Sequence, residues 1–156
     1  MALGFFPPGG RINPLKYHAL LFMETEAKIA HRLEIKIYYE DTDAGGVVYY
    51  ANYLRYFERA RTEFFLDKGI NVAEFHEKGY FFVVVSVDIQ YKQPARLGEI
   101  IEVVTKVMET TNATITLKHH VVKRGMLLVE SHVKLACINK NGKPQRLPAD
   151  VRKLSN

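Results

Sequence analysis

Residues 38–61 read YYEDTDAGGVVYYANYLRYFERAR, and the rest of the chain is best interpreted outward from them. This stretch begins extended, breaks at an acidic turn, passes Gly45 and Gly46, and enters an aromatic-rich helix. Asp43 lies ahead of that helix, where a glycine-containing loop can bring backbone close to a ligand. The first amides of a helix lack intrahelical partners and favour negative charge, so the pattern indicates a candidate catalytic site. The alternative is that Asp41 and Asp43 only make hydrogen bonds within their own turn, as Asx turns do.

Outward from this stretch, the hydrophobic periodicity changes in an order typical of an α+β domain. Residues 33–39 alternate apolar with polar, as a half-buried strand does. Apolar residues at helical spacing predict a long helix over 52–68, and Gly69 suits its C-terminal end. The other predicted elements are short helices at 72–78 and from Ala149, and strands at 81–91, 100–108, 114–122 and 127–138. We therefore expect an antiparallel five-stranded sheet wrapped around a long central helix.

The signature YEDTDAGGVVY at residues 39–49, followed by ANY at 51–53 and FERART at 57–62, resembles that of the YbgC-type acyl-CoA thioesterases. These enzymes form part of the 4-hydroxybenzoyl-CoA thioesterase branch of the hotdog-fold superfamily. The order of the downstream elements also fits, so the resemblance extends over residues 30–150. It implies that the predicted sheet and helix form a hotdog fold.

The resemblance also implies a reaction and the residues that perform it. The chain is expected to hydrolyse an acyl thioester without a metal or bound cofactor, using Asp43 as the carboxylate and the backbone N–H of Tyr50 to polarise the carbonyl. Asp43 would attack the carbonyl directly or activate a water, and the sequence does not separate these routes. The substrate-binding positions that the resemblance implies are Gly46, Val47, Val48, Tyr49 and Asn52.

Two features leave alternatives open. Close members of the family carry His where this chain has Tyr50, which keeps the backbone donor but removes an imidazole. An acyl-CoA or acyl-carrier-protein binding or scaffolding protein with weak or no turnover is therefore the alternative function. Glu58 is the second-choice carboxylate, because another branch of hotdog thioesterases uses a helix glutamate. Arg55 and Arg61 each lie three residues from Glu58, so we favour a structural ion pair.

Composition limits the partners. The 156 residues suit one domain, and a net charge of +5 attracts anions such as the phosphates of CoA or an acidic carrier protein. Without a compact basic run or a zinc-finger spacing, no nucleic-acid partner is expected. The cations near predicted turns that could meet CoA phosphates are Lys92, Arg96, Lys123, Arg124, Lys143 and Arg146.

Other reactive side chains are interpreted as structural. The histidines are scattered without metal-ligand spacing, so no metal site is expected. Ser86 lies in a valine-rich run that resembles a buried strand and not a nucleophile elbow. Cys137 is the only cysteine and lies in an apolar run, which predicts a buried thiol and fits a reducing, cytoplasmic compartment.

Residues 1–30 are expected to form an N-terminal extension, in part disordered, ahead of a thioesterase domain at 31–156. The apolar stretch at 19–23 is too short to span a bilayer, so no transmembrane segment is expected, while peripheral membrane association stays open. The resemblance implies a homodimer or homotetramer with sites at the dimer interface. It also suggests a link to the Tol–Pal cell-envelope system and to phospholipid metabolism of Gram-negative bacteria.

Overall fold

Alternating apolar and polar residues place five strands in one antiparallel sheet, in the spatial order β1-β3-β4-β5-β2. The structure, a computed structural model, describes residues 30–155. The predicted extension at 1–30 lies outside the described residues except for Ala30. The strands are β1 (His31–Lys36), β2 (Phe81–Tyr91), β3 (Ile100–Thr110), β4 (Thr114–Lys123) and β5 (Met126–Ile138).

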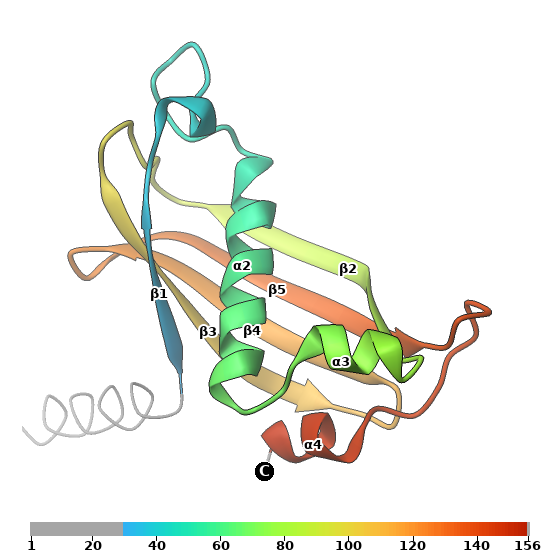
Figure 1. Cartoon of the computed structure of the whole chain (residues 1–156). Helices are drawn as coiled ribbons and strands as arrows, with labels where there is room; N and C mark the ends of the chain where they lie inside the picture. The colour runs from blue at the N-terminus through green and yellow to red at the C-terminus, as the bar shows by residue number, and fades with distance from the viewer. Residues whose placement is uncertain (1–29, 156) are drawn as a thin grey trace, which may run out of the picture.

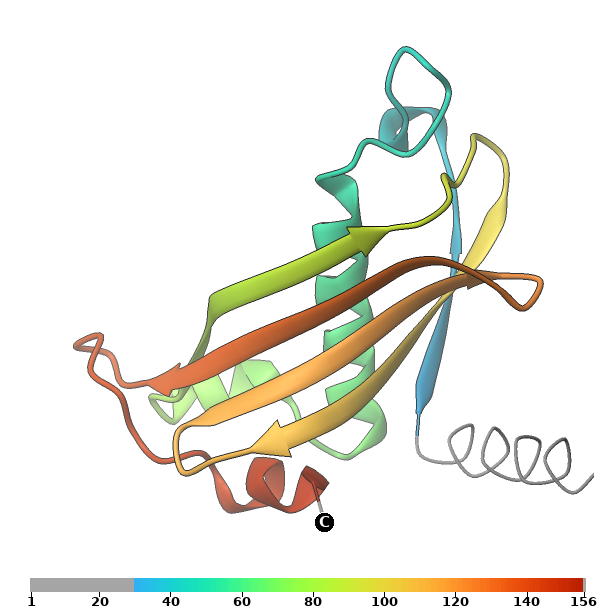
Figure 2. The same cartoon turned by 180° about the vertical axis from the view of Figure 1, so that it is seen from behind.

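The long helix lies against one face of this sheet, as Figures 1 and 2 show from opposite sides. It ends where Gly69 adopts a φ of 74°, a left-handed conformation that costs glycine little. Within residues 30–155, no helix is both long and apolar enough to cross a membrane. The helices are α2 (Asn52–Asp67), α3 (Val72–Glu77) and α4 (Ala149–Arg152), with short 3-10 turns η1 (Tyr39–Asp41) and η2 (Lys153–Ser155). The predicted α+β fold is confirmed.

The core is the layer between α2 and the sheet. Five aromatic residues of α2 are at most 2% exposed, so the aromatic content of this helix belongs to the core, as its spacing indicates. They are Tyr53, Tyr56, Phe57, Phe64 and Phe65. Opposite them, every second residue of the central strands faces inward, including Val103, Leu117 and Val133. Cys137 is buried in the same layer, as predicted.

Two strands differ from the sequence-based prediction. β1 ends at Lys36 instead of continuing to residue 39, because the carboxylate of Asp41 accepts the Tyr38 N–H at 2.8 Å and the chain turns into η1. β2 does not form a buried strand throughout, because among residues 30–155 it pairs with β5 alone and lies at the edge of the sheet. In its middle, Val84, Val85 and Val87 are 49, 54 and 41% exposed.

Candidate active site

Asp43 lies in a tight turn between β1 and α2. The N–H of Asp43 donates to the carbonyl of Val47 at 2.9 Å, and the N–H of Gly46 donates to the carbonyl of Asp43 at 3.0 Å. Gly46 takes a φ of 70°, which explains why this position suits glycine. The Val48 N–H then donates to the carbonyl of Ala95 at 2.9 Å and ties the turn to the segment that follows β2. The backbone of this acidic turn is thus held by bonds within the turn and by a bond to the segment after β2.

The carboxylate of Asp43 is exposed and only partly engaged. Its Oδ1 accepts the N–H of Gly45 at 2.8 Å, which is the Asx-type bond that the turn alone would predict. No protein group within residues 30–155 donates to Oδ2. One carboxylate oxygen therefore orients the side chain, and the other is available to a ligand or a water.

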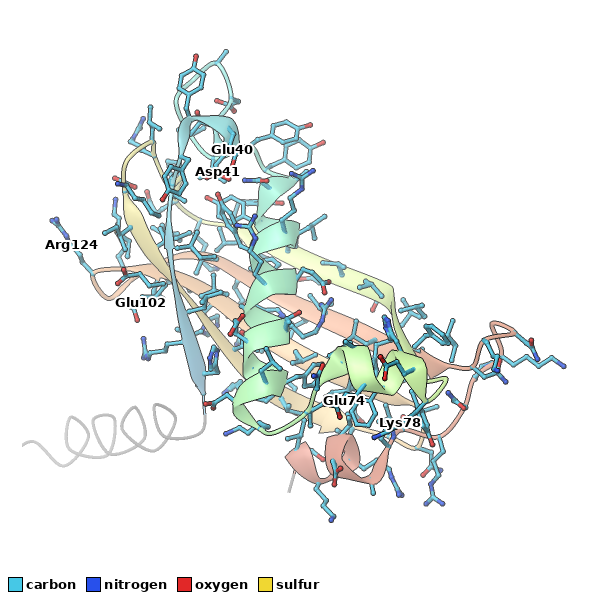
Figure 3. The ribbon with its side chains drawn as sticks, in the orientation of Figure 1. Glu40, Asp41, Glu74, Lys78, Glu102 and Arg124 are labelled. Atoms are coloured by element: carbon cyan, nitrogen blue, oxygen red, sulfur yellow. The ribbon has the colours of Figure 1, made fainter. Side chains whose placement is uncertain are left out.

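Asp41, two residues earlier, has a different environment. It is buried, and its carboxylate accepts the Tyr38 N–H at 2.8 Å and the side-chain amide of Asn52 at 2.7 Å. The carbonyl of Asp41 accepts the Tyr49 N–H at 2.9 Å. In Figure 3, Asp41 lies at the loop end of the molecule, above the start of α2. Asp41 joins the turn to the first residue of the helix.

The start of α2 presents backbone donors. The Asn52 N–H donates to the carbonyl of Tyr49 at 2.8 Å, whereas the amides of Tyr50 and Ala51 donate to no protein group in the described part of the chain. Such amides carry the positive end of the helix dipole and can stabilise negative charge. The side-chain amide of Asn52 donates to Asp41 and to Tyr56 Oη, at 2.7 and 3.0 Å, so it supports the turn from within.

A cleft of about 330 Å³ brings part of the predicted site together. Its lining residues are Asp43, Val47, Val48, Tyr50, Tyr53, Tyr91, Lys92, Gln93 and Pro94. Gly46, Tyr49 and Asn52, which the resemblance implies as binding positions, do not line it. The cleft wall formed by β2 and the segment after it was not predicted as part of the site, although Lys92 was among the candidate cations.

Neutral phenols make up much of this wall. Burial raises the pKa of Tyr91 and of Tyr53, so both hydroxyls stay protonated near neutral pH. The Tyr91 hydroxyl donates to the carbonyl of Tyr50 at 2.9 Å, and the Tyr91 ring packs against Tyr53 at a centroid distance of 5.7 Å. Lys92 is the one cation among the lining residues. The arrangement can offer a carboxylate, a backbone donor and a positive charge to one bound molecule.

Glu58 does not line the cleft. Its carboxylate, 60% exposed, forms an ion pair with Arg61, as favoured from the sequence. Arg61 is buried, and this burial lowers its pKa to about 10. Glu58, the second-choice carboxylate, thus forms an ion pair with the buried Arg61 on the same helix.

The remaining charged and imidazole groups lie elsewhere. His119 is buried between sheet and helix, where its Nδ1 lies 2.9 Å from Thr105 Oγ1 and its ring stacks on Phe57. Lys123 pairs with Glu99 at 2.8 Å beside a separate cavity of about 530 Å³, which contains no predicted catalytic residue. Arg124 projects from the β4–β5 turn, away from α2 (Figure 3).

Comparison with known proteins agrees with this fold and cleft. Residues 38–154 match the thioesterase-like superfamily. The chain is 38% identical over 122 residues to the acyl-CoA thioesterase YbgC of Haemophilus influenzae, covering 76% of this chain and 88% of that protein. It is 34% identical to the acyl-CoA thioester hydrolase YbgC of Escherichia coli O6:H1, covering 77% and 91%.

A solved structure shows the same architecture. The probable thioesterase from Bartonella henselae superposes with a TM-score of 0.72 at 36% identity, covering 76% of this chain and 99% of that one. The family match, these relatives and the five-stranded sheet around α2 agree with one another. The chain therefore belongs to the thioesterase-like superfamily, as a YbgC-type thioester hydrolase with the hotdog fold.

Proposed function

We propose that this chain hydrolyses an acyl-CoA ester to the free acid and CoA in the cleft that contains Asp43. The proposal depends on one observation: the same cleft is lined by Asp43, whose carboxylate is partly free, and by Tyr50, whose amide has no protein partner among residues 30–155. A thioester hydrolase needs a nucleophile or base and a donor for the carbonyl oxygen. Asp43 and the Tyr50 N–H fill these two roles.

The reaction develops negative charge on the thioester oxygen, which the Tyr50 amide at the start of α2 would stabilise. In the nucleophilic route, an oxygen of Asp43 bonds to the carbonyl carbon, the C–S bond breaks, CoA leaves as thiolate, and water hydrolyses the resulting anhydride. In the general-base route, Asp43 takes a proton from a water whose oxygen bonds to the carbonyl carbon; the C–S bond then breaks and CoA leaves as thiolate. Mass spectrometry of acid-quenched enzyme separates the routes, because only the first adds the acyl mass to Asp43.

Lys92 is the group that we assign to the CoA nucleotide, because it places a positive charge at the cleft. Its side chain is exposed, and its Nζ donates to the Gln90 amide oxygen at 3.5 Å. An ammonium without a close carboxylate partner is suited to a phosphate. The other turn cations, such as Lys123 and Arg146, do not line this cleft.

We infer that the working unit is a homodimer joined along β2, with a homotetramer as the larger assembly that the family suggests. The free edge of β2 offers unpaired backbone groups beside the exposed valines Val84, Val85 and Val87. Such an apolar edge needs pairing or cover. Because Tyr91 ends the same strand and lines the cleft, the site would lie close to this interface.

The test is thiol release from a panel of acyl-CoA esters that vary in chain length and aromaticity, run beside the matching acyl-carrier-protein thioesters. Release that exceeds the buffer rate supports the proposal, and the preferred carrier identifies the donor. Tight binding of the esters without release, by calorimetry, would favour the binding or scaffolding alternative. A free buried thiol at Cys137 is compatible with action in the cytoplasm, which localisation of a tagged chain can examine.

A further inference from the structure

Tyr91 connects the edge strand to the start of the helix. It is the last residue of β2, and its hydroxyl donates to the carbonyl oxygen of Tyr50 at 2.9 Å, across 41 positions of sequence. The position of Tyr91 is itself held, because the next two amides, Lys92 and Gln93, both donate to the carbonyl of Leu128 on β5, at 2.9 and 3.0 Å. Its ring also packs against Tyr53. The hydroxyl is thus a donor at a fixed place.

Peptide geometry gives this contact a consequence. A peptide unit is planar and trans, so fixing the direction of its C=O also fixes the direction of the N–H on the next residue. The carbonyl of Tyr49, held by the Asn52 N–H at 2.8 Å, shares its plane with the Tyr50 N–H. The carbonyl of Tyr50, held by Tyr91, shares its plane with the Ala51 N–H. Both planes that meet at Tyr50 are therefore anchored at the carbonyl.

Neither of the two amides carried by these planes donates to a protein group in the described part of the chain. Donors that stabilise a developing oxyanion act best when they are already oriented and need no reorganisation during the reaction. Without the Tyr91 hydroxyl, only the first plane keeps its anchor, and the peptide between Tyr50 and Ala51 is free to tilt.

We propose that Tyr91 is a positioning residue for thioester hydrolysis, which holds the Tyr50–Ala51 peptide so that the Ala51 N–H joins the Tyr50 N–H in meeting the developing oxyanion. This inference rests on the proposed function. Tyr91 does not itself touch the reacting atoms in this account. It acts through the backbone, and it makes the geometry of the donors depend on the position of the edge strand β2.

The test compares wild type with Tyr91→Phe, which keeps the ring that packs on Tyr53 and removes only the donor. Loss of one neutral hydrogen bond predicts that kcat falls by about three- to tenfold, while KM and melting temperature stay close to wild type. The amide resonances of Tyr50 and Ala51 in a nitrogen-15 spectrum should shift. Tyr39→Phe is the matched control, because Tyr39 is 82% exposed and does not line the cleft.

Unchanged kcat in Tyr91→Phe would overturn the inference, as would a rise in KM with kcat preserved, which would assign Tyr91 to substrate binding. A loss of activity that follows a loss of folded protein would make the role merely structural. The proposed function is judged separately, by thiol release from the wild-type chain and by the turnover of Asp43→Asn, neither of which depends on Tyr91. Tyr91→Leu, which also removes the ring, should lower kcat further and raise KM.

Discussion

The side-chain amide of Asn52 donates to the carboxylate of Asp41 at 2.7 Å, joining the acidic turn to the first residue of α2. The same amide donates to Tyr56 Oη at 3.0 Å, and burial and the nearby Asp41 both raise the pKa of Tyr56. This partly buried contact holds the turn in place, and two residues further on the carboxylate of Asp43 is left exposed. The two acids of the Asp-Thr-Asp sequence therefore differ in role: Asp41 stabilises the turn, and Asp43 is the carboxylate of the proposed reaction.

Asp41→Asn should destabilise the fold. The new amide would turn a donor toward either the Tyr38 N–H or the Asn52 amide, which leaves a partly buried hydrogen bond unmade. The expected loss is about 1–3 kcal/mol in the free energy of unfolding. Urea denaturation measures it, and Asp43→Asn, on the exposed turn, serves as the control with little change. Equal stability of both variants would contradict the role given to Asp41.

The buried imidazole of His119 should make the fold sensitive to acid. Burial, and then the charge of Arg61, lower its pKa from 6.5 to about 3, so the folded protein keeps it neutral. Below pH 6.5 the unfolded chain binds a proton that the folded chain does not. The free energy of unfolding should therefore fall between pH 6.5 and 3, by up to about 1.4 kcal/mol per pH unit from this group.

His119→Gln removes this titration while keeping a polar side chain. Its free energy of unfolding should vary less steeply with pH than that of the wild type over the same interval. Denaturation series at several pH values compare the two slopes, whatever the absolute stability of the variant. Identical slopes would mean that His119 is not held neutral in the folded protein.

Lys92→Ala should raise KM for acyl-CoA esters by about two- to fivefold, as expected for one exposed ion pair. The same variant should leave KM unchanged for acyl-pantetheine esters, which lack the nucleotide phosphates. The difference in KM for acyl-CoA esters between wild type and Lys92→Ala should shrink at high salt, because salt screens the attraction between Lys92 and the phosphates. Lys140→Ala, at an exposed lysine outside the cleft, is the matched control. An equal effect on both ester types would remove Lys92 from nucleotide binding.

Val85→Lys should disrupt the inferred dimer, since Val85 is exposed in the middle of the free edge strand. Light scattering should give a multiple of the 17.9 kDa chain mass for the wild type and a shift toward 17.9 kDa for the variant. Met126→Lys, which changes a residue 46% exposed at the start of β5, is the control and should keep the wild-type mass. A wild-type monomer at micromolar concentration contradicts the assembly.

Much of this fold can be predicted from the sequence because its periodicities are strong. The apolar stripe of residues 52–68 predicts α2 to within one residue, since the core-facing aromatic residues of this helix recur at regular spacing. The exposure of β2 could not be predicted, because a uniformly apolar run looks alike at the centre and at the edge of a sheet. That difference depends on the strand order, which gives β2 one neighbouring strand, β5, where a central strand has two.

The candidate site, too, has features that the sequence can predict and features that only the folded chain shows. The turn around Asp43 and the donor at Tyr50 lie in one continuous signature, so the sequence could indicate both. The burial of Asp41 could not be predicted from its identity, because it depends on Asn52, 11 residues away. The contact of Tyr91 with Tyr50 spans 41 residues and two elements, and only the folded chain brings these residues together.

The catalytic role of Asp43 is tested most directly by the turnover of Asp43→Asn with the acyl-CoA ester that the wild type prefers. Asparagine keeps the size of the side chain and the acceptor for the Gly45 N–H but removes the charge. If Asp43 is the catalytic carboxylate, kcat should fall by about two orders of magnitude or more, with circular dichroism and melting temperature unchanged. Near wild-type turnover in Asp43→Asn, together with loss of turnover in Glu58→Gln, would contradict this role and move the catalytic carboxylate to the helix.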